Sequence, residues 1–340
     1  MDTITVTPQQ AAPIIRDCID ADQPVMLWSA PGIGKSAIVE QVTKAAGRDM
    51  FTVLAHLKEA PDLSGYLVMT ECRRDEPPVM TAPADLPATT HPTPSVLFLD
   101  EINGAPQDVQ GSLYQLVQFG RLNNYRLPKD CARIAAGNRT NDRGVTKPMP
   151  TPLRNRFMHL TIEADREQWL AWAMQSGLAQ RAPLIYSYHH FERNGLMVFD
   201  PKSDEAAFAS PRSWEALSRY MAVNASPSLA AITGTIGTGQ GTAFAGFCKV
   251  AAELPPAEMV FFSPDTAPIP REPSALFAVC GNLAAACEVQ HMDAIVQYLD
   301  RLPDEYSALC MDIIRAKITP AVLMHLPAFT KWAQKHKYLF

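Results

Sequence analysis

An apolar run followed at once by a glycine-containing loop is the feature that most constrains this chain. Pro24–Trp28 is typical of a buried strand, and the loop Ser29-Ala-Pro-Gly-Ile-Gly-Lys-Ser36 leads into a helix predicted over about 35–46. Glycines let a backbone approach phosphate oxygens closely, and the amides at a helix start favour anions. Strand, loop and helix in this order match the P-loop pattern. The strict pattern has glycine where this chain has Ser29, and a strand-to-helix turn with an incidental lysine is the alternative interpretation.

A second apolar run, Val96–Leu99, ends in the acidic pair Asp100-Glu101. An aspartate at the carboxyl end of a buried strand can hold Mg²⁺, and a neighbouring glutamate can polarise an attacking water. A pair of carboxylates that opens the next helix is the alternative. The P-loop in the same chain favours the first interpretation. We therefore expect Lys35 to contact the β- and γ-phosphates of ATP, and Ser36 and Asp100 to hold Mg²⁺.

Four further polar residues are candidates for the same chemistry. Asn138 follows a predicted strand over 132–136, where its amide could hold the water or the γ-phosphate; a simple Gly-Asn turn is the alternative. Arg154 and Arg156 precede a predicted strand over 158–162, and a guanidinium there could reach the γ-phosphate of a neighbouring subunit. A surface arginine pair is the alternative. Arg212, taken alone, is only a residue at a helix start.

Strands that alternate with helices predict a parallel, three-layered α/β core. The residue patterns predict strands over 24–28, 51–54, 95–99, 132–136 and 158–162, and helices over about 8–19, 35–46 and 106–119. Thr7 and Gln10 predict a capping box at the start of the first helix. Residues 65–95 hold many prolines and little periodicity, which indicates an insertion or a long loop.

The spacing of apolar residues becomes helical from Asp165 onward. Helices are predicted around 169–178 and over 212–223, 276–289 and 292–299, whereas 254–273 contains six prolines and is interpreted as a connector. We therefore expect an α/β core over residues 1–165, a helical lid over 166–253 and a helical C-terminal extension over 254–340.

The composition excludes several classes of protein. A net charge of −5 gives no basic footprint for a general nucleic-acid binder. Seven scattered cysteines without a C-x-x-C pair indicate reduced thiols rather than a disulfide frame or a zinc site. His189-His190 and His291 lack further ligands at a metal-binding spacing, which favours surface or packing roles. A polar, acidic N-terminus and the lack of a long apolar run predict a cytoplasmic protein without a signal peptide or a membrane span.

Taken in order, these motifs resemble the AAA+ ATPases, and within them the MoxR family, over roughly residues 8–220. The resemblance is carried by Ala30–Ser36, Pro61–Gly65, Leu99–Asn103, Gly137-Asn138, Leu153–Phe157 and Ser210–Arg212. It implies a P-loop AAA+ core with a nucleotide-binding loop formed by Pro31, Gly32, Ile33, Gly34, Lys35, Ser36 and Ala37. It also implies that Asp100 and Glu101 are the Walker B pair, Asn138 is sensor 1 and Arg212 is sensor 2. Arg156 resembles the arginine finger, with Arg154 as runner-up, and residues about 62–90 resemble the family's insert.

The resemblance further implies a hexameric ring with ATP between subunits. MoxR-like ATPases act as remodelling chaperones, often with a partner that bears a von Willebrand factor type A domain. We therefore expect Mg²⁺-dependent hydrolysis of ATP to ADP and phosphate, coupled to remodelling of a protein client. A nucleotide-gated assembly module with incidental turnover is one alternative, and a nucleic-acid motor or loader is another that the acidic charge disfavours. Ser29 and residues 254–340 depart from the family pattern.

Overall fold

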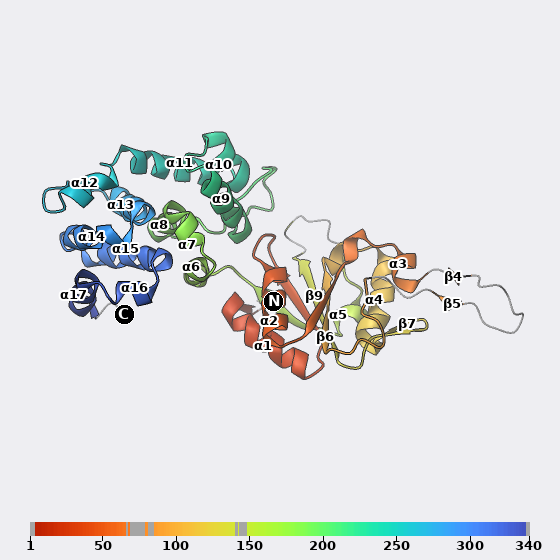
Figure 1. Cartoon of the computed structure of the whole chain (residues 1–340). Coiled ribbons are helices and arrows are strands. Elements are labelled where there is room, and N and C mark those ends of the chain that lie inside the picture. The colour runs from red at the N-terminus through yellow and green to blue at the C-terminus, as the bar shows by residue number, and fades with distance from the viewer. Residues whose placement is uncertain are drawn as a thin grey trace, which may run out of the picture. The chain divides into compact units, whose positions relative to one another are not determined.

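The computed structural model describes residues 4–65, 67–68, 79–80, 85–139, 142 and 148–337, with the backbone alone for Ser64 and residues 67–68 and 79–80. The chain divides into two compact units (Figure 1). The first is Met1–Ala164 with Asp200–Lys202, and the second is Asp165–Phe199 with Ser203–Phe340. The positions at which we predicted domain boundaries stay predictions.

A parallel sheet forms the centre of the first unit (Figure 1). Among the described residues it has six strands in the order β1-β10-β2-β9-β6-β3. In chain order they are β1 (Thr5–Val6), β2 (Val25–Ser29), β3 (Asp49–Leu54), β6 (Ser95–Asp100), β9 (Cys131–Asn138) and β10 (Met158–Ile162). Five of these strands were predicted from apolar runs; β1, with two residues, is too short to leave such a pattern. The predicted α/β fold is confirmed.

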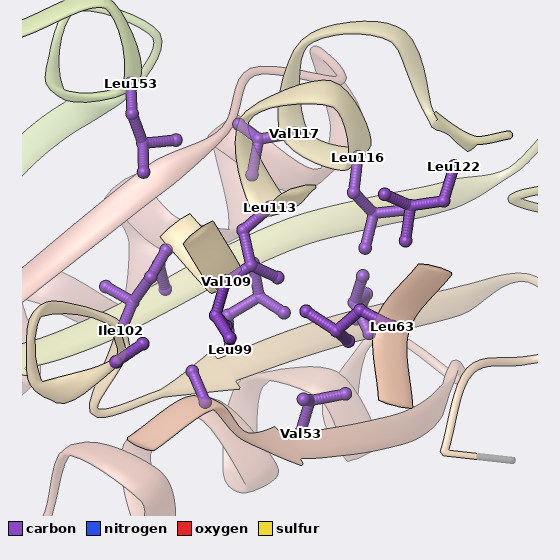
Figure 2. Packing of buried hydrophobic residues seen from close by; sticks show 14 of the residues in the cluster. Val53, Leu63, Leu99, Ile102, Val109, Leu113, Leu116, Val117, Leu122 and Leu153 are labelled. Carbon is purple, nitrogen blue, oxygen red and sulfur yellow. The ribbon is translucent and has the colours of Figure 1, made fainter. Parts of the chain in front are cut away.

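Helices cover both faces of this sheet, because successive strand residues point to opposite sides. Val25, Leu27, Val96 and Phe98 pack with residues of α1 (Pro8–Asp20) and α2 (Lys35–Ala45). The alternate strand residues face a second cluster, which includes α4 (Gln107–Phe119) and α5 (Thr151–Arg154). Figure 2 shows Val109, Leu113, Leu116 and Val117 of α4 pointing into this cluster together with Val53, Leu99 and Leu153. The result is a three-layered sandwich with the predicted capping box between Thr7 and Gln10 at the start of α1.

Short elements fill the connections of the first unit. They are η1 (Ala55–Leu57), α3 (Ala60–Ser64), η2 (Ile102–Gly104) and two antiparallel pairs, β4 (Leu67–Val68) with β5 (Val79–Met80) and β7 (Arg121–Leu122) with β8 (Tyr125–Arg126). The β4–β5 pair lies within the segment predicted as an insertion or long loop. Beyond it, Leu86 is buried in the second cluster and the Tyr125 hydroxyl donates to Pro87 O at 2.6 Å. Residues 66, 69–78 and 81–84 of this predicted insertion lie outside the described residues.

The described part of the second unit is built from helices, apart from one bridge between Val198 and Ala209. The helices are α6 (Arg166–Gln175), α7 (Leu178–Arg181), α8 (Pro183–Phe191), α9 (Pro211–Val223), α10 (Leu229–Ile236), α11 (Thr238–Glu253), α12 (Ala257–Phe262), α13 (Pro273–Ala286), η4 (Val289–His291), α14 (Met292–Leu299), α15 (Asp304–Lys317), α16 (Pro320–Leu323) and α17 (Pro327–Lys335). The four predicted helical regions are present. The interpretation of residues 254–273 as a plain connector is wrong, because α12 lies within it and buries Val260. Helix α13 packs on α8 and α11 inside this unit.

Candidate nucleotide site

The carboxyl ends of three neighbouring strands bring the predicted site residues of the first unit together. Ser29, the last residue of β2, lies opposite Asn138, the last residue of β9. On the other side of β9, β6 ends at Asp100, which is in register with Leu54 of β3. In open parallel sheets this edge is where ligands bind.

The loop after β2 has the backbone conformation that a phosphate-binding loop needs. Gly32 and Gly34 have φ values of 85° and 102°, which residues with a side chain rarely adopt. Gly34 caps α2, whose first turn contains Lys35, Ser36 and the exposed Ala37. Pro31 and Ile33 lie in the same loop and are half-buried. The backbone amides at this helix start give the loop positive potential.

Lys35 is the most enclosed charged group of the site, with 8% of its surface exposed. Its Nζ donates to Asn138 Oδ1 at 2.9 Å and to Ser29 Oγ at 3.0 Å, and lies 3.4 Å from Ser29 O. A buried ammonium needs such partners, because an unpaired charge away from water is costly. The lysine of the loop and the amide at the end of β9 are therefore in direct contact.

Ser36 and Asp100 form the second contact across the site. The Ser36 hydroxyl donates to Asp100 Oδ2 at 2.9 Å, and the other carboxylate oxygen accepts the backbone N–H of Glu101 at 3.0 Å. The loop after β2 and the acidic end of β6, which lie far apart in the sequence, thus meet in space. Hydroxyl and carboxylate oxygens are the ligands that Mg²⁺ prefers.

Glu101 leaves the strand with a left-handed backbone, φ 52° and ψ 39°. A non-glycine residue with this geometry is uncommon and often lies at a functional site. Its side chain is 47% exposed, and its Oε2 lies 3.0 Å from Nδ1 of His56 in η1. Sequence reasoning missed His56. The available clue was its position two residues past β3, whose carboxyl end lies beside that of β6.

Asn138 is held by a second residue that sequence reasoning assigned no role. The side-chain amide of Asn103, in η2, donates to Asn138 O at 2.7 Å. Gly137 makes room for this contact, because a Cβ there would lie 2.3 Å from Asn103 Oδ1 and 2.8 Å from Met26 Cε. The glycine of the Gly-Asn pair is therefore required by close packing.

The candidate arginines lie outside this hydrogen-bonded group. Arg154 ends α5, and Arg156 follows it two residues later; both side chains are exposed. The Arg156 guanidinium lies over the Tyr114 ring of α4, with Cζ 6.0 Å from the ring centroid. Arg212 is an exposed residue in the first turn of α9, in the second compact unit, where Ser210 forms a capping box with Ser213.

The histidines predicted to have surface or packing roles pack against aromatic rings. His189 is fully buried, with its ring centroid 4.7 Å from that of Trp169 and 4.4 Å from that of Trp214. His190 packs against Tyr186 at 4.9 Å, and His291 stacks on Phe261 at 4.0 Å. Burial away from water, with Arg166 nearby, lowers the pKa of His189 to about 3 and that of His190 to about 4.

Residues 24–157, which include this site, match the family model of the AAA domain, dynein-related subfamily. These residues are an AAA domain. The matched segment runs from the start of β2 to the residue after Arg156, so it contains the whole hydrogen-bonded group described above. The match supports the predicted AAA+ assignment and the ATPase activity expected from it, and the MoxR subfamily stays a prediction.

Solved structures similar to this chain include two proteins of low identity. A variant of RuvB from Thermotoga maritima is 11% identical, with a TM-score of 0.37; the match covers 97% of this chain and 88% of that one. NtrX from Brucella abortus, in complex with ADP, is 12% identical, with a TM-score of 0.42; the match covers 97% of this chain and 68% of that one. With TM-scores below 0.5, these likenesses do not bear on function. No curated protein matches the sequence.

None of the helices in the described ranges combines the length and the apolar character needed to cross a bilayer.

Proposed function

We propose that this AAA+ protein uses the polar side chains at the carboxyl edge of the sheet to hydrolyse ATP to ADP and phosphate. The observation that carries the proposal is the pair of contacts Lys35–Asn138 and Ser36–Asp100, which join the glycine loop to the ends of β9 and β6. A triphosphate placed on the loop amides would then lie beside five functional groups: an ammonium, a hydroxyl, two carboxylates and an amide. They belong to Lys35, Ser36, Asp100, Glu101 and Asn138.

Each side chain has a role that follows from its chemistry and position. Lys35 contacts the β- and γ-phosphates, to which it brings a positive charge. Glu101 accepts a hydrogen bond from the attacking water, so that its half-exposed carboxylate orients the oxygen toward phosphorus. Asn138, which Asn103 holds in place, contacts the water or the γ-phosphate through its neutral amide.

The residues present fit a magnesium ion beside the triphosphate. Ser36 Oγ and Asp100 Oδ2 lie 2.9 Å apart, so two hard oxygen ligands already face each other. Mg²⁺ prefers few protein ligands together with phosphate and water oxygens, which matches this small donor set. When bound, the ion would neutralise phosphate charge.

We further propose that the chain assembles as a ring, by resemblance a hexamer, in which Arg156 of one subunit reaches the γ-phosphate of the next. Support comes from its exposed side chain and from its position outside the hydrogen-bonded group of its own pocket. A heterologous interface places the same arginine into every neighbouring site, and closes into a ring. Arginine fingers contribute roughly 10³–10⁵ in rate. Arg154 is the alternative finger, and Arg212 is proposed to contact nucleotide from the helical region.

The work done by hydrolysis is proposed to be remodelling of a protein client in the manner of MoxR-like chaperones, with a von Willebrand factor type A domain protein as partner. The net charge of −5 fits a protein client better than a nucleic acid. A pull-down with Glu101→Gln, which should hold ATP and keep clients bound, identifies the client.

Phosphate release by the purified chain, compared with Glu101→Gln, tests the hydrolytic proposal. The unchanged chain is expected to release phosphate in the presence of Mg²⁺ and ATP. The variant should lose most of this rate while keeping its affinity for ATP, because the amide cannot accept the proton of the water. Equal and near-zero rates for both proteins, measured at concentrations where they assemble, would contradict it.

A further inference from the structure

Ser29 occupies the position at which the strict loop pattern has glycine, and its side chain is engaged in the site. It is the last residue of β2, fully buried, and lies opposite Asn138 of β9. Its hydroxyl donates to Ala30 O at 2.8 Å and accepts from Lys35 Nζ at 3.0 Å. The proton of the hydroxyl is therefore directed away from the lysine and a lone pair toward it.

The ammonium of Lys35 has three N–H groups, and the hydrogen bonds of the described residues include three protein acceptors within its reach. Two belong to Ser29, its hydroxyl oxygen at 3.0 Å and its carbonyl oxygen at 3.4 Å, and the third is Asn138 Oδ1 at 2.9 Å. A phosphate oxygen that binds this nearly buried ammonium must take the place of one of them. Glycine at this position would supply the carbonyl but no hydroxyl.

We propose that the Ser29 hydroxyl competes with the phosphates of the nucleotide for Lys35, and so sets the affinity of the site for nucleoside di- and triphosphates. This rests on the proposed function, in which Lys35 contacts the β- and γ-phosphates. The hydrogen bond from Ser29 to Ala30 O does not involve the lysine. It is therefore kept when nucleotide binds, and it favours neither Ser29 nor phosphate as the partner of Lys35. Ser29 is thus a positioning residue that acts through Lys35.

Removal of the hydroxyl should therefore tighten binding. The Ser29→Ala substitution is made in the Glu101→Gln chain so that ATP is not consumed. This variant is expected to bind ATP and ADP about tenfold more tightly, because it lacks the charge-assisted hydrogen bond between Lys35 and the Ser29 hydroxyl that competes with phosphate. Affinity for AMP, which has no β-phosphate, should stay unchanged. Calorimetric titration of the three nucleotides measures these values, and a thermal melt verifies that each variant is folded.

A double-mutant comparison separates competition from a change in loop shape. In a Lys35→Ala background, Ser29→Ala should no longer alter ATP affinity, because the competing group has no lysine to hold. Ser29→Gly, which supplies the residue of the strict pattern, should act in the same direction as Ser29→Ala and replaces it if the alanine variant does not fold.

The outcomes distinguish this inference from the function on which it rests. Unchanged or weaker ATP binding in both folded Ser29 variants overturns the inference, as does equal tightening of AMP. If Lys35→Ala alone leaves ATP affinity unchanged, the proposed role of Lys35 fails. If Lys35→Ala weakens ATP binding while the Ser29 variants bind like the parent, only the competition by Ser29 fails.

Discussion

At the scale of single residues, the polar groups at the carboxyl edge of the sheet hold one another in place before any nucleotide binds. Lys35 is paired with Asn138, Ser36 with Asp100, and Glu101 lies within ion-pair distance of His56. Each pair satisfies groups that would otherwise lose hydrogen bonds to water. A nucleotide bound as we propose would therefore have to exchange some of these partners for its phosphates.

Gly137 is the residue whose substitution tests this arrangement most directly. Gly137→Ala places a Cβ against Asn103 Oδ1 and Met26 Cε, so Asn103 must move away from Asn138. We expect a loss of about 1–3 kcal/mol in the free energy of unfolding, as for overpacking in a core, together with reduced phosphate release. Gly111→Ala is the matched control, because nothing lies within 4 Å of a Cβ there and alanine has a higher helix propensity than glycine at this exposed position of α4. Equal urea midpoints for the two variants would contradict the steric explanation.

At the scale of elements, α8 holds the core of the second unit together through aromatic rings. Tyr188 and His189 lie in it side by side and pack against Trp214 with ring centroids 5.6 Å and 4.4 Å away. Within the described part of the chain, neither ring nitrogen of His189 has a hydrogen-bond partner. The neutral ring is tolerated there as an apolar group, whereas a protonated ring would be an unpaired buried charge.

This burial predicts a pH dependence of stability for the second unit. The pKa of His189 is about 3 and that of His190 about 4 in the folded chain, below the ordinary value of 6.5, so between these values the unfolded chain binds protons that the folded chain does not. Stability should therefore fall as pH decreases below about 6.5, by up to about 1.4 kcal/mol per pH unit for each histidine, and level off below the folded pKa values. Urea unfolding at pH 5 and pH 7 measures the loss.

His189→Phe keeps an aromatic ring in the same place but cannot be protonated. The loss of stability between pH 7 and pH 5 should become smaller by about 2 kcal/mol in this variant, since one of the two titrating groups is gone. His325→Gln, at an exposed histidine, is the control and should leave the loss unchanged. A His189→Phe chain with the same pH dependence as its parent would show that other groups cause it.

The elements that could be predicted from the sequence are those whose apolar pattern is long enough to read. The sequence predicted several buried strands and amphipathic helices with small shifts at their ends, among them β2, β3, β6, β9, α1, α2 and α4. For β3, the structure has Asp49–Leu54 where a strand was expected over 51–54. The two-residue strands β7 and β8 leave no period to detect. Helices α10 and α11 are rich in glycine and threonine, which local propensity disfavours. Tertiary packing stabilises them, since a Cβ on Gly241 of α11 would lie 2.7 Å from Thr233 of α10.

More of the candidate site than of the helical second unit could be predicted from the sequence, because the motifs of the site follow predicted strands. The P-loop pattern, together with the positions of Asp100 and Asn138 directly after predicted strands, assigned these residues and Lys35 to one site without coordinates. His56 and Asn103 could not be found in this way. Their contacts depend on side-chain directions in η1 and η2, and neither residue belongs to a periodic pattern.

At the scale of the whole molecule, the residues proposed to act on one nucleotide belong to different parts of the chain. In the first unit Lys35 contacts Asn138, and Ser36 contacts Asp100. Arg156 lies over Tyr114, away from them, and Arg212 belongs to the second unit. A monomer whose arginine serves another subunit would be a poor enzyme alone, so the specific rate of hydrolysis should depend on assembly.

Mixing two inactive variants tests whether Arg156 acts in a neighbouring subunit. Glu101→Gln lacks the group that orients water but keeps the arginine, and Arg156→Ala lacks the arginine but keeps an intact pocket. In an equimolar, randomly mixed ring, about a quarter of the interfaces pair an intact pocket with an intact arginine, so phosphate release should recover to about a quarter of the unchanged rate. A mixture of Glu101→Gln with Lys35→Ala is the control and should stay inactive, because each pocket lacks one of its own residues. If the first mixture also stays inactive although mass measurement shows mixed assemblies, the arginine acts within its own subunit. If Arg156→Ala by itself keeps its activity, Arg154 is the finger, and Arg154→Ala takes its place in the same mixing experiment.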